Sequence, residues 1–547
     1  MDRCFWENLL VAIRYRPVER DQEFLLPPNM ADWLDADHVV WFLIDVVAEL
    51  DLTQIYERSA LRRDGRPVRT SAGRAAYDPE MLLTLLIYGY ACRERSSRQI
   101  ERLCHTDIAF RLICAGDVPD HSVLARFRVA HAEAFAGLFT QVLRLCREAG
   151  LVKLCTVAID GSKIAANASK QANRSGRWLD TEAEKIDREN AERADRVVVE
   201  QMLAEAAATD EVEDAEHGAA RGDELPPRWG GRGGRRERIR AAKARIAAVE
   251  QARCEAEAAK AAKLAERDAA ALAAAEQALA AQIASRVAAQ HAWESAWEHA
   301  VADPDSPVPT GRAPKAPEES VLVRRAQARV DKARHRVAHP DIAPRRGRRP
   351  DPARQDKTPL ANTTDPDSTI MPTRNGWIQG YNNQFAVSAD QIILATAVST
   401  NPADITSYET MVAATAAALT ALGAGDELRT LLFDAGYASN DTLTAASPDQ
   451  LIALGKTHSI QAAARDNPTS GPPPPGATAR QAMDHRLRTP EGAKLYKRRG
   501  ATVEPGIGNF KKLLDRYSQR GLLAATSETH LTATVFNLLK IHRTATT

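Results

Sequence analysis

At 547 residues, 44% of them apolar, the chain exceeds one ordinary domain and can bury substantial cores, so roughly two or three domains are expected. Its net charge of +1 does not by itself indicate a nucleic-acid binder. No apolar run is long enough to span a bilayer, the first residues lack a signal-peptide layout, and the seven cysteines form no C-x-x-C pair. These features exclude membrane, secreted and disulfide-scaffold classes and predict a cytoplasmic protein.

The first part of the chain predicts a helical domain after an irregular start. Residues 1–30 contain several prolines and no clear periodicity, whereas residues 31–150 place apolar side chains at helical spacing. The predicted helices cover 39–50, 79–91, 97–104 and 122–145.

Four arginines make this helical domain a candidate for DNA binding. Their short helices and tight connections are compatible with a helix-turn-helix-like module in which arginines grip phosphate. The alternative is a helical scaffold whose arginines merely solvate its outer face. The candidate DNA contacts are Arg98, Arg102, Arg126 and Arg128.

A long block, residues 171–354, departs from this pattern. Residues 236–302 are dominated by Ala, Glu, Lys and Arg without Gly or Pro, and residues 321–337 predict a returning helix. Flexible linkers are expected around the glycines and prolines of 222–234 and 304–317. The block therefore predicts a helical hairpin or coiled-coil arm, although its thin alanine stripe leaves partial disorder as the alternative.

Three acidic residues in different settings are the candidate catalytic groups. Asp160 follows the apolar run 154–159, Asp434 follows 431–433, and Glu504 lies on a basic segment. A buried strand that ends at an Asp delivers a carboxylate to the end of a sheet, and converging carboxylates bind divalent metal. Taken singly, each Asp is also compatible with an ordinary turn, and Glu504 with a surface ion-pair cluster.

The order of elements around these acids predicts the fold. Residues 380–389 and 392–399 read as a β-hairpin, 409–422 as a helix, and Glu504 as part of a following helix. A strand, this hairpin, a helix and a strand ending at Asp434 reproduce the order of a ribonuclease-H-like mixed sheet. The roughly 270 residues between Asp160 and Asp434 far exceed an ordinary loop, so the helical block must be an insertion.

The predicted architecture is α+β. It has an irregular segment (1–30), a helical DNA-binding domain (31–150), and a ribonuclease-H-like mixed α/β catalytic domain (151–170 and 355–547) interrupted by the helical insertion (171–354).

One spacing points to a family. Tyr496-x-x-Arg499-x-x-x-x-Glu504-x-x-x-x-x-x-Lys511 resembles the Tyr-Arg-Glu-Lys signature of bacterial insertion-sequence DDE transposases, with one extra residue between the Arg and the Glu compared with its shortest form. Other stretches resemble the same enzymes in the same order. They are residues 77–83, 88–90, 96–102, 120–128, 160–169, 365–368 and 380–384.

The resemblance implies a DNA transposase that binds terminal inverted repeats and joins cut ends to target DNA. Asp160, Asp434 and Glu504 would hold Mg²⁺, with Mn²⁺ as a substitute. Tyr496, Arg499 and Lys511 would lie near the scissile phosphate: Arg499 and Lys511 as electrostatic clamps, Tyr496 stacking on a base or orienting the phosphate.

The implied partners are double-stranded DNA and further copies of the chain, at least a dimer, in a bacterial cytoplasm at the nucleoid. No membrane partner is expected. Two alternatives stay open: a metal-dependent nuclease that never joins DNA, and an inactive or domesticated DNA-binding protein.

Overall fold

The computed structural model describes residues 18, 29–59, 75–191, 234–303, 306–340, 359–445 and 448–545. The chain forms two compact units, Met1–Arg245 with Leu360–Thr547, and Ile246–Pro359. Within the described ranges, no helix combines the length and the apolar character needed to cross a membrane. Most of the irregular segment 1–30 and nearly all of the expected linker 222–234 lie outside the described ranges.

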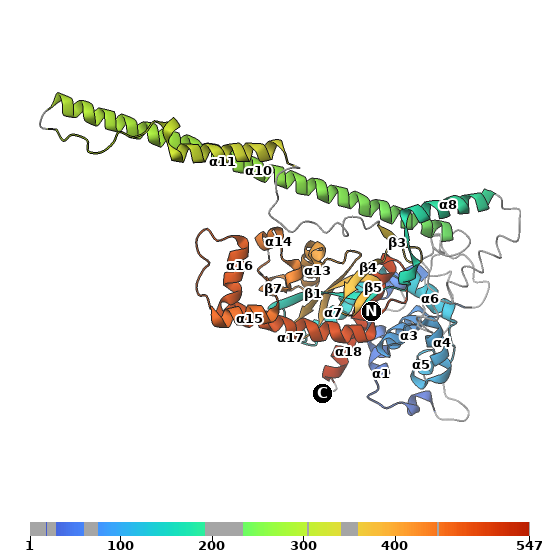
Figure 1. Cartoon of the computed structure of the whole chain (residues 1–547). Helices are drawn as coiled ribbons and strands as arrows, with labels where there is room; N and C mark the ends of the chain where they lie inside the picture. Colours follow the sequence, from blue (N-terminus) through green and yellow to red (C-terminus); the bar gives the residue numbers. More distant parts are fainter. Residues whose placement is uncertain are drawn as a thin grey trace. The chain divides into compact units, whose positions relative to one another are not determined.

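Short helices with side-chain caps build the first part of the larger unit (Figure 1). Asp78, Ser96, Asp107 and Asp120 each accept a backbone N–H at a helix start, which satisfies donors that the helix cannot pair internally. The predicted continuous helix over 122–145 is wrong, because the chain turns at 131–133 and divides it in two. The helices are η2 Met30–Trp33, α1 Val39–Glu49, α2 Thr53–Ser59, α3 Pro79–Ala91, α4 Ser97–Thr106, α5 Ile108–Ile113, α6 His121–Ala130 and α7 Ala134–Glu148.

A mixed sheet forms the centre of this unit. Its strands are β1 Thr156–Ala165, β4 Thr369–Thr373, β5 Gly376–Ser388, β6 Ile393–Ser399, β7 Thr430–Phe433 and β8 Gln450–Ile452. β5 pairs antiparallel with β1 on one side and with β4 and β6 on the other, while β1, β7 and β8 run parallel. The order is therefore β6-β5-β1-β7-β8, with β4 beside β6 along β5. The predicted hairpin is confirmed as β5 and β6.

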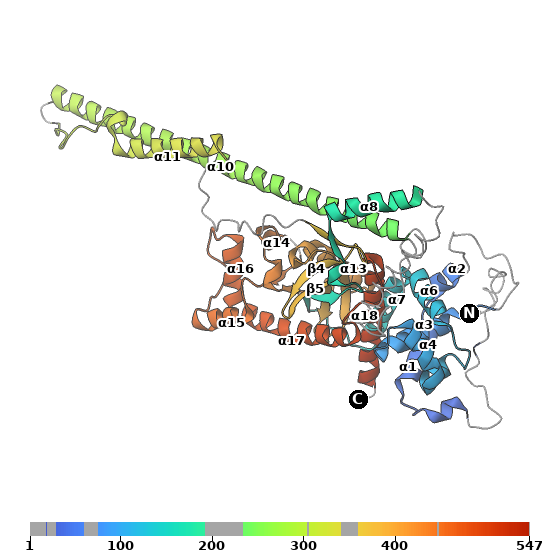
Figure 2. The same cartoon turned by 45° about the vertical axis from the view of Figure 1, so that its right-hand side comes forward.

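Helices follow the strands in the second half of the unit. They are η6 Asp404–Ser407, α13 Tyr408–Ala421, η7 Gly425–Glu427, η8 Ala435–Tyr437, α14 Asn440–Thr444, α15 Thr457–Asp466, α16 Ala479–Arg488, α17 Pro490–Leu513 and α18 Leu522–Ala545. α17 contacts β1 and β5, and α18 contacts β6, α7 and α3. α18 contacts both the sheet and the early helices (Figure 2). The apolar side chains of these elements belong to one core.

A buried polar network ties α3 and α6 to the C-terminal part of the chain. Arg128 Nη1 donates to Tyr90 Oη at 2.9 Å and to Ser518 Oγ at 3.0 Å. Tyr90 Oη and Ser518 Oγ in turn donate to Glu528 Oε1, at 2.8 and 2.6 Å. Pairing the buried charges and hydroxyls in this way offsets the free-energy cost of removing them from water.

The second unit is a pair of helices. α10 Gly234–Ala302 begins in the larger unit, and α11 Val321–Ala338 returns after η5 Pro317–Glu319. Arg334 of α11 lies 3.0 Å from Glu276 of α10. The buried side chains of α11 recur at helical spacing: Val323, Ala326, Val330 and Ala333. The predicted helices over 236–302 and 321–337 are confirmed, whereas a coiled coil stays a prediction.

The first turns of α10 belong to the larger unit. Lys243 of α10 lies 2.6 Å from Asp180 of α8 Gly176–Ala191, and Arg235 pairs with Glu182. The chain then returns through the short ladder of β2 Asn173–Ser175 and β3 Leu360–Asn362. Strands on either side of the inserted helices therefore pair with each other. η3 Lys170–Ala172 precedes β2.

Candidate active site

The register of two parallel strands brings Asp160 and Asp434 together. β1 pairs with β7 up to Ile159 and Phe433, and each of these residues is followed by an aspartate. Asp434 ends its strand as predicted, but Asp160 does not, because β1 continues along β5 as far as Ala165. Asp160 therefore lies where β1 parts from β7, and the two carboxylates face the same end of the parallel pair.

Arg499 of α17 is the cation beside this pair. Its Nη2 lies 2.7 Å from Asp160 Oδ2, and its side chain is 8% exposed. The contact is an ion pair without well-aligned hydrogen-bond geometry, since Nη2 and Nε of Arg499 have no hydrogen-bond partner. Tyr496, Val503 and Phe510 share the buried face of α17 with Arg499, and this face holds the guanidinium against β1.

Burial and like charge raise the pKa of both aspartates. Burial raises the pKa of the Asp160 carboxyl to about 6; Arg499 opposes the rise, and Asp434 and Asp404 add to it. Burial also raises the pKa of Asp434, again against the effect of Arg499. Carboxylates that repel one another in a partly buried space are stabilised by an added cation.

Asp404 of η6 is a third carboxylate at this site, and it is not among the acids that the sequence pattern predicts. Its Oδ1 accepts hydrogen bonds from Asn382 Nδ2 at 2.8 Å, Gln384 Nε2 at 3.0 Å and Lys163 Nζ at 3.1 Å. Its only local signal is a position shortly after the predicted strand 392–399. That position is equally typical of a turn, so nothing in the sequence distinguishes it.

Two glycines make room for Asp404 between the strands. A Cβ on Gly161 would overlap Asp404 Oδ1 and the Gln384 amide. A Cβ on Gly436 would lie 3.0 Å from Asp434 Oδ1 and 3.2 Å from Asp404 Oδ2. Both carboxylates therefore border Gly436, whose N–H donates to Asp434 Oδ1 at 2.8 Å.

The other residues of the expected signature occupy different surroundings. Glu504 is exposed on α17, one helical turn from Gly500. Lys511 is half-buried and its Nζ donates to the Lys163 carbonyl at 3.3 Å, which places it against β1. Tyr496 is only 2% exposed, so base stacking, one of the two roles expected for it, does not fit this structure.

The four arginines expected to contact DNA do not share one environment. Arg98, Arg102 and Arg126 are exposed on α4 and α6. Arg128 is fully buried in the network with Tyr90 and Ser518. The expectation that Arg128 contacts phosphate is therefore wrong, because its guanidinium is buried and hydrogen-bonded inside the fold.

The donor set of the site fits a hard divalent cation. Asp160, Asp434 and Asp404 offer oxygen ligands, and Mg²⁺ and Mn²⁺ prefer oxygen. The negative charge of these three carboxylates exceeds the positive charge that Arg499 and Lys163 bring.

A second carboxylate group lies among the early helices. Ligand atoms of Glu101, Asp120 and His121 lie within 4.8 Å of one another. Glu101 Oε2 already contacts His121 Nδ1 at 2.8 Å, and Asp120 caps α6. These contacts show that the three side chains hold the start of α6 in place, which explains why they lie together.

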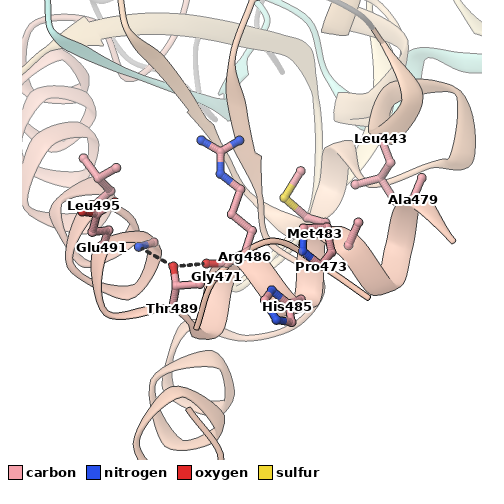
Figure 3. A pocket seen from close by; sticks show the side chains of 12 residues that line it. Leu443, Gly471, Pro473, Ala479, Met483, His485, Arg486, Thr489, Glu491 and Leu495 are labelled. Carbon is pink, nitrogen blue, oxygen red and sulfur yellow. Dashed lines mark hydrogen bonds between the residues drawn. The ribbon is translucent and has the colours of Figure 1, made fainter. Parts of the chain in front are cut away.

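A cavity of about 460 Å³ lies away from the three aspartates, among α14, α16 and α17 (Figure 3). Thr489 at its floor accepts from the Gly492 N–H and donates to the Arg486 carbonyl. Glu491, the acid nearest in sequence to Glu504 on α17, lines this cavity rather than the site. The cavity is therefore separate from the candidate active site.

Two family models match the chain. Residues 29–130, which span α1 to α6, match a transposase domain (DUF772), and residues 475–542, which contain Tyr496, Arg499 and Glu504, match a transposase DDE domain. Comparisons with curated proteins and with solved structures gave no match. Together, the two matched segments support a transposase function, and the DDE domain model suggests a nucleic-acid-processing enzyme.

Proposed function

We propose that the chain is an insertion-sequence DDE transposase that binds terminal inverted repeats and catalyses metal-dependent DNA cleavage and strand transfer. The observation that carries the proposal is the register that places Asp160 and Asp434 side by side where β1 and β7 part. The order β6-β5-β1-β7-β8, antiparallel on one side of β1 and parallel on the other, agrees with a ribonuclease-H-like sheet.

Asp160 and Asp434 are the proposed metal ligands, with Glu504 as the acid that the family signature adds from α17. Bound Mg²⁺ would help to deprotonate the attacking water or 3′-hydroxyl and would stabilise the departing oxygen. Glu504 is on the same helix as Arg499 but is exposed, so it is accessible to a DNA end that approaches α17. Between Arg499 and Glu504 this chain has one more residue than the shortest form of the signature.

Arg499 and Lys511 are the proposed electrostatic clamps of the scissile phosphate. Arg499 is held beside Asp160 in this structure, and metal binding to Asp160 would free the guanidinium to pair with a phosphate oxygen. Lys511 reaches β1 next to Lys163, so its ammonium is close to the strand that carries Asp160. Tyr496 packs inside, and its role is to support Arg499.

The helices within 31–150 are proposed to hold terminal DNA through the exposed Arg98, Arg102 and Arg126. Pairing of two DNA ends requires at least two copies of the chain, so a homo-oligomer is part of the proposal. The catalytic domain is proposed to comprise 151–170 and 355–547, with 171–354 as its insertion.

A strand-transfer assay tests the proposal. Purified protein is incubated with Mg²⁺, a pre-cut DNA end from the flank of its reading frame and a circular target. Joined products support a transposase. Cleavage of uncut ends without joining would favour a metal nuclease, and end binding without either reaction would favour an inactive DNA-binding protein.

A further inference from the structure

Asp404 is held in one orientation by groups that cannot easily rearrange. Asn382 and Gln384 are fully buried on β5, and both amide nitrogens donate to Asp404 Oδ1. Tyr437 donates its hydroxyl to Gln384 Oε1, which fixes which end of that amide faces the carboxylate. Such a shell of buried hydrogen bonds is typical of a carboxylate that is oriented for a ligand.

The second oxygen of Asp404 borders the same glycine as Asp434. A Cβ on Gly436 would lie 3.2 Å from Asp404 Oδ2 and 3.0 Å from Asp434 Oδ1, and Lys163 Nζ lies 3.4 Å from Asp404 Oδ2. The side chains of Asp404 and Lys163 are 19% and 20% exposed, so water and ions reach them. The ammonium of Lys163 thus neutralises a carboxylate that has a second carboxylate within reach.

We propose that Asp404 is a ligand of the divalent metal at this site, together with Asp434, and that Lys163 Nζ takes the place of the cation at Asp404 when the metal is absent. This inference rests on the proposed function, because it adds an acid to the metal centre assumed there. It departs from the three acids of the signature, since Asp404 follows β6 and is not on α17. Binding of the metal would displace Lys163, which would then be free to contact a DNA phosphate.

Mn²⁺ binding to the full-length protein tests the inference without any need for catalysis. Free Mn²⁺ is measured by electron paramagnetic resonance during a titration at pH 7.5, in the absence of DNA. Asp404→Asn should weaken Mn²⁺ binding at least tenfold, comparably to Asp434→Asn. Asp426→Asn, an exposed aspartate of η7, is the matched control and should leave the binding unchanged.

The variant Lys163→Met tests whether Asp404 binds the metal directly or only positions Lys163. If Asp404 binds the metal, removing the competing ammonium should tighten Mn²⁺ binding severalfold, and unchanged binding would count against the inference. If Asp404 only positions Lys163, both variants should weaken binding, and the inference is then overturned. Should Asp404→Asn fail to fold, the Lys163→Met result still decides between these outcomes.

The remaining outcomes separate this inference from the proposed function. Loss of Mn²⁺ binding in Asp434→Asn but not in Asp404→Asn would overturn the role of Asp404 and leave the transposase proposal standing. Absence of Mn²⁺ binding in the unaltered protein would overturn both.

Discussion

Arg499 Nη2 lies 2.7 Å from Asp160 Oδ2. This ion pair joins α17, near the end of the chain, to β1, which lies in the first third of the chain. The proposed chemistry requires both elements. The ion pair also gives the partly buried Asp160 carboxylate a cationic partner, which opposes the rise of its pKa caused by burial.

Replacement of the proposed metal ligands should separate catalysis from DNA binding. Asp160→Asn, Asp434→Asn and Glu504→Gln should each reduce Mg²⁺-dependent cleavage by at least about 100-fold, because each removes a negatively charged oxygen ligand. Gel shifts with end DNA should change less than about threefold. Glu491→Gln is the control, since Glu491 lines the separate cavity. A variant that cleaves at a near-normal rate would show that its residue is misassigned.

Arg128 should matter for stability rather than for DNA. Arg128→Met removes the donor to Tyr90 and Ser518 and leaves their buried oxygens short of a partner, so the free energy of unfolding should fall by roughly 3 kcal/mol. Arg126→Met on the same helix should cost less than about 1 kcal/mol, because Arg126 is exposed and its hydrogen bonds go to Ser122, one turn earlier on α6. Urea denaturation measures both. Equal losses of unfolding free energy in the two variants would contradict the burial of Arg128.

Binding of terminal DNA should depend on Arg98 and Arg102. The double change Arg98→Gln with Arg102→Gln should weaken DNA binding. It should also reduce the slope of log affinity against log salt concentration by about 1 to 2, because a protein that makes fewer phosphate contacts releases fewer counterions when it binds. Arg144→Gln on α7 is a control with the same charge change at another exposed position. An unchanged slope in the double variant would exclude this face of α4 as the DNA contact.

His530 should make the protein less stable in acid. Burial lowers the pKa of His530 in the folded chain to about 4, from an ordinary value of 6.5. Between these values the unfolded chain binds more protons, so the folded state is favoured above about pH 6.5 and loses stability as the pH falls toward 4.

A phenylalanine in place of His530 should remove this dependence. His530 already stacks on Phe139, with ring centroids 6.0 Å apart, so the substitution keeps the contact between α18 and α7. Between pH 7 and 4.5, His530→Phe should lose about 2 kcal/mol less of its unfolding free energy than the unaltered protein does. The exposed His458 gives the control His458→Phe. Parallel curves for His530→Phe and the unaltered protein would contradict the prediction.

Removal of the second unit should leave the first one folded. Replacing residues 246–359 with a Gly/Ser linker keeps the part of α10 that contacts α8 through Lys243 and Asp180. Thermal melting and Mn²⁺ titration should stay close to those of the full chain. End pairing in gel shifts should fall, since a long helical arm is suited to bridging copies of the chain. Loss of folding would show that the arm supports the core.

The sequence predicted those parts of the site that depend on local pattern. Asp434 was identified because a short apolar run stops there, and Arg499 because its spacing to Tyr496 matches a signature. Asp404 was missed, because its position beside the other acids results from the return of β6 along β5. Arg128 was misassigned for a similar reason: Ser518 and Glu528, which complete its buried network with Tyr90, lie beyond residue 510, and no local signal in the sequence indicates this contact.

β1 is synthesised long before the two strands that flank it in the sheet. Its two neighbours in the sheet, β5 and β7, are both synthesised after the inserted helices. While the ribosome is still making the arm, Asp160 is part of a strand without partners, and the chain has no centre to hold a metal. Only when β7 and then α17 emerge can the carboxylates meet and Arg499 pair with one of them. A truncated translation product that ends before β7 and α17 would therefore lack the proposed metal centre.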